Sequence, residues 1–518
     1  MKRFLFFFYS IFVLTSYSVA ENDSTLVIFE DLSFSSATEK EAFRNRKDTS
    51  SRNLFFLYSV ISEKNDGYLS TKFDEILSFT KEYKTGRFAK RRKKRQIKIL
   101  YKDAHKKFLD QYKQNAYYPD IFSKGEYNCL TASMLYAQIF KILNIPFEIK
   151  LALNHVYLVA YPKSESIKVE TTRPSDGYEI FNSHFKRKYI SHLVDNKIIS
   201  DKEYKTKSID ELFNEYYFKE KNINLVELAG LQYFNRAISH MKVKEFKKAF
   251  PDMEKAYYLN RSEQPRFMLN ILNLQVLNET ERTSPGYIEY LCKYTRHDEG
   301  NKKDLILEEF GILTNEYLIN RYDCDQYENL YHKLRDNISE KEICNEIDFY
   351  YNYERARVLY NKGEYKEAYP YIKDAYKANS RNVDCKQLLV SIIGNKISKT
   401  PTGKPMLDSL KHYLNNFKFL EKNDMFIKLK LNNYLFLMYQ NFLKNNPELA
   451  NKYKDKFEYN YLSKDYPSLY RIIGAAYGSG GKYYFKKGRY SKAKSIIKTG
   501  LEYVPNSIEL QSRLRALQ

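Results

Sequence analysis

The chain has 518 residues, with 86 Lys and Arg against 64 Asp and Glu and a formal net charge of +22 at pH 7. This length suits about three domains of roughly 150 residues, or one compact domain followed by an extended repeat array. The positive charge favours acidic partners such as anionic lipid or glycan, and no stretch beyond residue 20 is apolar enough to cross a bilayer, which argues against an integral membrane protein.

The first twenty residues have the features of a secretory signal. Lys2 and Arg3 precede an apolar run over residues 4–14, and small residues stand at 18 and 20, where a signal peptidase cuts. The apolar run is shorter than the roughly 20 residues of a membrane span, which disfavours an uncleaved anchor. We therefore expect residues 1–20 to be removed and the protein to be exported, to the periplasm or beyond the bacterial cell envelope. Export argues against nucleic acid as the partner.

Two patterns divide the remaining chain, at 21–215 and 216–518. Up to about Asp120 the apolar spacing is helical, as in FDEILSFTKEYKTGRF and IKILYKDAHKKFLDQY. Between these segments lies a dense positive run, formed by Lys90, Arg91, Arg92, Lys93, Lys94 and Arg95. Such a run favours a solvated helix face, and contact with an anionic surface is the alternative.

The pattern changes twice after residue 128. Leu135, Ile139 and Ile142 share one stripe, which predicts an amphipathic helix that ends near Asn144 and Pro146. FEIKLAL (147–153) alternates with period two, HVYLVAYP continues extended, and IKVETT forms a third short strand. A helix followed by three strands with short connections predicts an α+β domain with an antiparallel sheet.

Beyond about residue 220, helical segments with recurring small residues replace the strands. Three segments share this spacing: FNRAISHMKVKEFKKAFPDMEKAYYLN, ERARVLYNKGEYKEAYPYIKDAYKANSRN and GGKYYFKKGRYSKAKSIIKTGLEYVPN. They resemble tetratricopeptide repeats, which pair helices in units of about 34 residues. Their central alanines lie 119 and 125 residues apart (249, 368 and 493), which are not multiples of 34, so we expect the helices between them to be irregular or to contain insertions. Such an array predicts an all-α region that holds a peptide or protein partner.

Cysteine is sparse. Cys292, Cys324, Cys344 and Cys385 allow up to two disulfides with undetermined pairing, and Cys129 is then left over. Neither a CxxC pair nor an HExxH motif is present, so the sequence predicts no metal site and no cofactor.

Cys129 stands where the predicted helix begins. A helix N-terminus and a nearby histidine both favour the thiolate that attacks acyl carbons. His155 follows at the start of the second strand, and Glu170 lies on the third, so a hairpin brings the two together. Nucleophile, base and orienting carboxylate then come from three successive elements.

The stretch from Tyr127 to Pro174 resembles the core of the transglutaminase-like cysteine-peptidase superfamily, which has a papain-like arrangement. There a Cys opens a helix that ends in a Gly-Ile-Pro-like phrase, here LNIPFEI, and strands with His and Asp complete the triad. The resemblance implies Cys129 as nucleophile, His155 as base and Glu170 as third member. Glu replaces the commoner Asp, and Asn144 stands where Gly is usual.

Two further roles stay open at this point. The backbone N–H of Cys129 is a candidate oxyanion donor, and the side chains of Tyr127 and Asn128 are others, although both suit a helix cap or packing equally. His105, His184 and His192 are rival bases, but none lies in so clear a strand context.

The sequence thus predicts an exported two-part protein, with thiol-mediated acyl transfer or amide hydrolysis in the first part and partner recruitment in the second. Water as acceptor gives a peptidase or amidase, and a lysine amine gives a cross-linker. The alternative is a non-catalytic interaction scaffold that keeps the transglutaminase-like fold. A binder of anionic surfaces through residues 90–95 is a third hypothesis.

Overall fold

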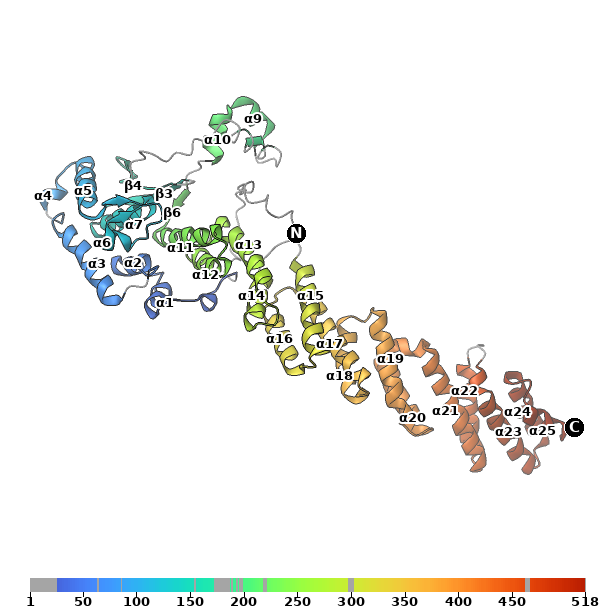
Figure 1. Ribbon diagram of the computed structural model, residues 1–518. Coiled ribbons are helices and arrows are strands. Elements are labelled where there is room, and N and C mark those ends of the chain that lie inside the picture. The colour runs from blue at the N-terminus through green and yellow to red at the C-terminus, as the bar shows by residue number, and fades with distance from the viewer. Residues whose placement is uncertain are drawn as a thin grey trace. The chain divides into compact units, whose positions relative to one another are not determined.

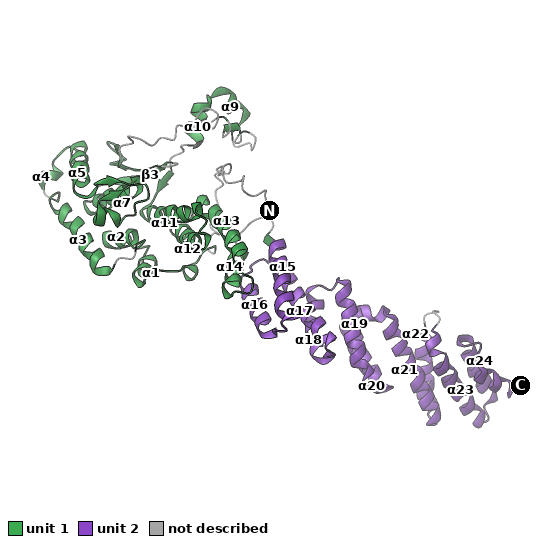
Figure 2. Cartoon of the chain, in the orientation of Figure 1, with its two compact units in different colours: residues 1–302 green, residues 303–518 purple. Residues whose placement is uncertain are grey.

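A computed structural model of the chain describes residues 26–517, apart from 63–64, 85, 153–154, 172–186, most of 188–198, 218–220, 297–301 and 462–465. The chain divides into two compact units, residues 1–302 and 303–518 (Figure 2). The predicted signal at 1–20 lies outside the described residues. Within them, no helix combines the length and the apolar character that a membrane span needs.

The first unit is mostly helical up to about residue 120, as the sequence predicts (Figure 1). Its helices before the sheet are η2 (Phe29–Asp31), α1 (Ala37–Arg44), α2 (Ser51–Ser59), α3 (Asp66–Lys81), α4 (Gly86–Ala89), α5 (Lys93–Phe108), α6 (Asp120–Lys124) and α7 (Cys129–Ile142). Two short strands, β1 (Gln111–Tyr112) and β2 (Glu126–Tyr127), pair in parallel; β1 precedes α6 in the chain, and β2 directly precedes α7. The helices after the sheet are α9 (Asp201–Thr206), α10 (Ile209–Tyr217), α11 (Leu225–Lys242), α12 (Phe246–Leu259), α13 (Glu263–Glu279) and α14 (Pro285–Thr295).

A four-stranded antiparallel sheet follows α7. Its strands are β3 (Phe147–Ala152), β4 (His155–Ala160), β5 (Ile167–Val169) and β6 (Lys221–Ile223), in the order β5-β4-β3-β6. The first three are the strands predicted from period-two spacing. The fourth was not predicted, because strand spacing is no longer evident in the sequence beyond about residue 220. It pairs Ile149 with Ile223, so chain beyond residue 215 completes this sheet.

Helix α7 is buried on all sides rather than amphipathic, which corrects the sequence expectation. Every residue from Leu130 to Phe140 is buried. The helix packs against β3 and β4 on one side and against α2, α3 and α11 on the others. The sequence stripe was misread because hydroxyl and amide residues interrupt it: Thr131, Ser133 and Gln138 are buried too, and each makes a hydrogen bond.

The α11–α12 pair packs into the core of the first unit, although its sequence resembles a repeat of the second part. Tyr233 and Tyr257 share one hydrophobic cluster with Phe43 and Leu54 of the N-terminal helices. The compact unit therefore extends to residue 302, whereas the composition changes near residue 215.

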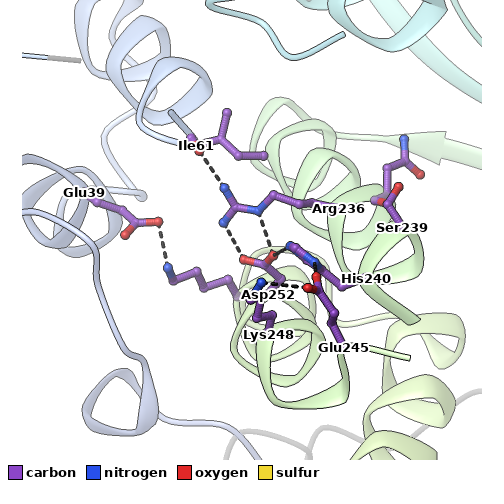
Figure 3. Close-up of polar contacts among 10 residues, drawn as sticks. Glu39, Ile61, Arg236, Ser239, His240, Glu245, Lys248 and Asp252 are labelled. Carbon is purple, nitrogen blue, oxygen red and sulfur yellow. Dashed lines mark hydrogen bonds and ion pairs between the residues drawn. The ribbon is translucent and has the colours of Figure 1, made fainter. Parts of the chain in front are cut away.

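A buried ion pair and a hydrogen bond to the backbone join this pair of helices to the N-terminal part of the unit (Figure 3). Lys255 Nζ lies 2.8 Å from Glu39 Oε1, and both side chains are almost completely buried. Arg236 donates from Nε to Asp252 Oδ2 at 2.7 Å and from Nη1 to the carbonyl oxygen of Ile61 at 2.6 Å. Buried charges need such partners, because an unpaired ion in the core is costly.

The second unit is a tetratricopeptide-like array of paired helices. Its elements are α15 (Lys302–Leu313), the π-helical η3 (Thr314–Asn320), α16 (Cys324–Asp336), α17 (Lys341–Asn361), α18 (Tyr365–Ala378), α19 (Val383–Ser398), α20 (Lys404–Asn416), η4 (Lys418–Lys422), α21 (Asp424–Leu443), α22 (Pro447–Asn460), η5 (Pro467–Leu469), α23 (Tyr470–Lys486), α24 (Tyr490–Tyr503) and α25 (Ile508–Arg515). The three repeat-like segments form the pairs α11–α12, α17–α18 and α23–α24, as predicted.

The repeats in this unit are longer than 34 residues. Helices α17, α19, α21 and α23 begin at Lys341, Val383, Asp424 and Tyr470, which are 42, 41 and 46 residues apart. The offset of 125 residues between two of the sequence copies is therefore three long repeats. The intervening helices form the pairs α19–α20 and α21–α22, whose extra length fits the expected insertions, and the π-helical η3 lies between the first two copies.

The turn within three of these pairs has one backbone geometry. Gly363, Asn445 and Gly488 take positive φ angles of 81°, 56° and 68°. The next residue then donates its N–H to the carbonyl five residues earlier at 2.9 Å, as in Glu364 to Leu359. This left-handed closure favours glycine, and asparagine tolerates it. The pair α21–α22 was not among the sequence copies, and Asn445 stands at its turn in place of glycine.

The two disulfides that the sequence allows among Cys292, Cys324, Cys344 and Cys385 are not formed in the structure. Cys324, Cys344 and Cys385 are free thiols, as is Cys129. Burial raises the pKa of Cys385 to about 12, which leaves that thiol unreactive at neutral pH.

Candidate active site

The N-terminus of α7 positions Cys129. Asn128 caps the helix: its side-chain oxygen accepts from the N–H of Thr131, and its own N–H donates to Thr131 Oγ1, both at 2.9 Å. Cys129 is consequently the first helical residue, half-buried, with a backbone N–H that has no acceptor within the helix. A thiol at this position faces the positive end of the helix dipole.

The two strands after α7 bring His155 and Glu170 together. His155 opens β4, and Glu170 directly follows β5, whose residue Lys168 pairs with Val159. Paired residues on neighbouring strands lie on the same face of a sheet, and so do residues two or four apart on one strand. His155 is four residues before Val159, and Glu170 is two after Lys168, so the two side chains lie on the same face. The His155 Nε2 atom donates to Glu170 Oε2 at 2.8 Å. The sequence hypothesis required this contact.

His155 also contacts the nucleophile candidate. A hydrogen bond with the Cys129 side chain is the main cause that raises the pKa of His155 above its ordinary value of 6.5. Burial opposes the shift, and the hydrogen bond to Glu170 adds to it. Because Glu170 occupies Nε2, the nitrogen available to the thiol is Nδ1. The three residues thus form one hydrogen-bonded chain from sulfur to carboxylate.

Lys168 is a fourth polar residue at the site, and sequence reasoning missed it. Its Nζ atom lies 2.6 Å from Glu170 Oε1, so each carboxylate oxygen has its own cationic partner. Burial alone raises the pKa of Glu170, but the hydrogen bonds from Lys168 and His155 bring that pKa below its ordinary value of 4.5. Glu170 is therefore ionised at neutral pH and available to hold an imidazolium.

The Tyr157 ring contacts both His155 and Lys168. It stacks on the His155 ring with centroids 5.9 Å apart, and Lys168 Nζ lies 4.2 Å from the tyrosine centroid. The sequence held a signal for both residues. Tyr157 is two positions after His155 and Lys168 is two before Glu170, and residues at this spacing on a strand lie on the same face.

Two hydroxyl groups tie the helix to the strands. Thr171 Oγ1 donates to the carbonyl oxygen of Cys129 at 3.2 Å, and Ser133 Oγ donates to the carbonyl oxygen of Val156 at 3.0 Å. Ser133 and Thr171 are buried and lie 3.2 Å apart. Ser133 is one helical turn after Cys129, so the sequence alone could have placed it on the same side of the helix as the candidate nucleophile. These bonds fix the helix start against the strand that carries His155.

The predicted oxyanion side chains have other partners. The Asn128 amide nitrogen donates to the carbonyl oxygens of Gln114 and Ala116, each at 2.9 Å, so the cap occupies it. Tyr127 is largely buried, and its ring meets those of His105 and Tyr112 edge to face. The backbone N–H of Cys129 is left as the donor with the suitable position.

The rival histidines do not share this geometry. His105 lies on α5, where its ring contacts the rings of Tyr101 and Tyr127. His184 and His192 lie outside the described residues. Tyr112, which is mostly exposed, is close enough to Cys129 to interact with it electrostatically, and nothing in the sequence indicated this.

The positive run at residues 90–95 lies between α4 and α5 and enters the first turn of α5. Lys90, Arg92, Lys94 and Arg95 are exposed. Lys93 is half-buried and donates to Ser164 Oγ at 3.0 Å, with its Nζ 4.9 Å from the centre of the Tyr161 ring.

Comparison with known proteins gives no close relative. No family model matches the chain, and no curated protein matches it. Among solved structures, the TPR domain of P58(IPK) shares 14% identity over 57% of this chain and 91% of its own length, with a TM-score of 0.18. The Naa15/Naa10 structure bound to HypK-THB shares 12% identity over 57% of each chain, with a TM-score of 0.14.

Proposed function

We propose that the first unit is a thiol-dependent acyl-transfer or amide-hydrolysing enzyme that acts on protein or peptide substrates. One observation carries the proposal: His155 is hydrogen-bonded to Cys129 on one side and to Glu170 on the other. This order of nucleophile, base and carboxylate is the geometry that activates a cysteine for acyl chemistry. The resemblance of residues 127–174 to the transglutaminase-like core supports the same assignment.

In the proposed reaction the Cys129 thiolate attacks the amide carbonyl carbon, and the negative charge that develops on oxygen faces the backbone N–H of Cys129. The His155 imidazolium gives its proton to the leaving amine, which leaves a thioester on Cys129. Neutral His155 then takes a proton from water or from a second amine as that group attacks the thioester. Water releases an acid, and an amine gives a new amide.

Glu170 acts through His155 in this scheme. Its carboxylate fixes the ring orientation and stabilises the imidazolium, as the third member of a triad does. Lys168 and Tyr157 hold the carboxylate and the ring, respectively, and we treat them as positioning residues.

The second unit supports a role in recruitment. Arrays of paired helices are protein-interaction folds, since stacked repeats expose an extended face. We propose that this unit binds a protein or peptide partner and that the protein works after export to the periplasm or the cell exterior. If the thiol site proves inactive, the scaffold hypothesis takes its place.

The chain holds its own control for the thiol. Cys324 is the first residue of α16, with Asp323 as its cap, so it shares the helix position of Cys129. Both thiols are partly exposed. The surroundings of Cys324 differ, because it has the Asp323 carboxylate as cap and Arg355 nearby. The change in the Cys129 rate on His155→Ala therefore reports the effect of His155, and Cys324 serves as the internal reference.

The test is alkylation by iodoacetamide from acid to alkaline pH, read by mass spectrometry of the peptides that carry Cys129 and Cys324. We expect Cys129 to react faster than Cys324 at neutral pH, because a histidine that accepts the thiol proton increases the share of reactive thiolate. His155→Ala should lower the Cys129 rate and leave the Cys324 rate unchanged. Equal rates in the wild type, unchanged by the substitution, would rule out the enzyme and leave the scaffold.

A further inference from the structure

The turns within the helical pairs of the second unit lie along one edge of it. Antiparallel helices put every second connection on the same side, and Figure 1 shows the turns of α19–α20, α21–α22 and α23–α24 on one edge, opposite the connections between pairs. We call the turns of the last three pairs, residues 399–404, 443–447 and 485–490, the turn edge; the α17–α18 turn at residues 361–365 carries Lys362 and Glu364 and is not part of it.

The turn edge carries positive charge only. Its charged residues are Lys399, Lys404, Lys444, Lys486, Lys487 and Arg489, with no Asp or Glu among its 17 positions. All six cations are exposed. Charge also rises toward the last pair, because residues 466–501 contain eight Lys and Arg and no acidic residue.

These six cations have no ion-pair partner within the part of the chain that the structure describes. Elsewhere in the unit some basic residues are paired, such as Lys377 with Asp374 and Arg513 with Glu509. Others, such as Lys373 and Lys411, are exposed and make no ion pair with the residues that the structure describes. On the opposite edge, Lys418 lies 3.6 Å from Glu421. The charge on the turn edge is therefore available to an external anion.

Large hydrophobic side chains stand among the cations. Leu443, Phe485 and Tyr490 are 52%, 48% and 58% exposed, and the two aromatic rings meet edge to face with centroids 5.3 Å apart. Exposed aromatic and aliphatic groups beside lysines are typical of surfaces that bind at a bilayer interface, where the apolar groups enter and the cations meet the headgroups.

We propose that the turn edge docks the protein on a bilayer surface that contains anionic phospholipid. A row of turn tips offers separate points of contact, which suits a broad surface of diffuse negative charge. An acidic peptide, in contrast, needs acceptors aligned along a continuous groove. This inference does not depend on the thiol site, and it concerns residues other than 90–95.

The test is co-sedimentation of the full chain with vesicles of phosphatidylcholine and phosphatidylglycerol, compared with phosphatidylcholine alone. The edge variant replaces all six turn-edge cations with Gln. The control variant makes the same six-charge change at exposed sites away from the edge, at Lys373, Lys411, Lys422, Lys452, Lys498 and Arg515. A third variant, Phe485→Ser with Tyr490→Ser, removes the aromatic pair.

We expect the edge variant to bind anionic vesicles at least about tenfold more weakly than the control, since each cation near such a surface strengthens binding several-fold. Wild-type binding should weaken with added salt as the Debye length shortens, and the aromatic variant should also bind less. If the edge and control variants lose vesicle binding equally, the binding comes from the overall positive charge of the protein and not from the turn edge. Binding to soluble poly-glutamate but not to vesicles would assign the edge to an acidic protein; either result overturns the proposal.

Discussion

His155 Nε2 lies 2.8 Å from Glu170 Oε2, while Lys168 Nζ lies 2.6 Å from the other oxygen of the same carboxylate. Glu170 is thus held between two cationic groups on one face of the sheet, and His155 meets Cys129 through its remaining nitrogen. A change of charge on His155, Glu170 or Lys168 therefore affects the other two residues.

Glu170→Gln should lower the pKa of His155. The hydrogen bond from Cys129 is the larger cause of the raised pKa, but the carboxylate adds to it, so part of the shift should disappear. NMR titration of labelled histidine measures this, and the resonances of His240, which contacts Glu245 at 2.9 Å, should stay unchanged. An unchanged titration of His155 would contradict the contact.

The same pair sets a pH window for stability. The raised pKa of His155 gives a contribution that is complete below pH 6.5 and is lost as pH rises through the folded value. The lowered pKa of Glu170 gives a contribution that is complete above pH 4.5 and is lost as pH falls through its folded value. The destabilisation by Glu170→Gln, measured by denaturant unfolding, should therefore be largest between these limits.

Lys168→Gln should raise the pKa of Glu170 toward 4.5, because one of its two cationic partners is removed. The ¹³C resonance of the Glu170 carboxyl reports this directly. Lys150→Gln is the matched control: Lys150 lies on the neighbouring strand β3 and pairs with Glu148 at 2.9 Å. If both substitutions shift Glu170 equally, Lys168 has no specific role.

Lys255→Met should destabilise the first unit by about 3–5 kcal/mol, because it leaves the Glu39 carboxylate buried without its cation. Urea unfolding measures the loss. Lys248→Met, at a mostly exposed ion pair with Glu245, should change the free energy of unfolding by no more than about 0.5 kcal/mol. Adding Glu39→Gln to Lys255→Met should recover part of the loss, and failure to do so would indicate lost packing instead.

Gly500→Ala should destabilise the α23–α24 pair. A Cβ atom at this position would lie 2.6 Å from Tyr477 Cβ, too close for any contact. Overpacking of this kind costs about 1–3 kcal/mol, which outweighs the roughly 1 kcal/mol that alanine gains over glycine in a helix. Thermal unfolding should show the loss, whereas Ser495→Ala, at an exposed position of the same helix, should have little effect.

Neutralising the exposed members of the 90–95 run tests the anionic-surface hypothesis for the first unit. Replacing Lys90, Arg92, Lys94 and Arg95 with Gln should reduce retention on a sulfated-glycan column if the run is a binding surface. Lys40, Lys81, Lys98 and Lys106, also exposed, provide a control of equal charge. Equal retention of the two variants would identify the run as a solvated surface.

The local order of elements could be read from the sequence alone, because it depends on periodicity and caps. Period-two spacing located β3, β4 and β5, and small residues with glycine turns located α17–α18 and α23–α24. Cys129 was placed at a helix start because the helical stripe of Leu135, Ile139 and Ile142 follows it. These signals lie within a few residues of one another.

Only the tertiary structure decided which surfaces meet. The burial of α7 on all sides, the fourth strand at Lys221–Ile223 and the attachment of α11–α12 to the first core depend on contacts between distant segments. So does the second cation on Glu170, since register across two strands places Lys168 there. Periodicity determines which face of an element is apolar, but the packing partner and the register follow from the whole fold.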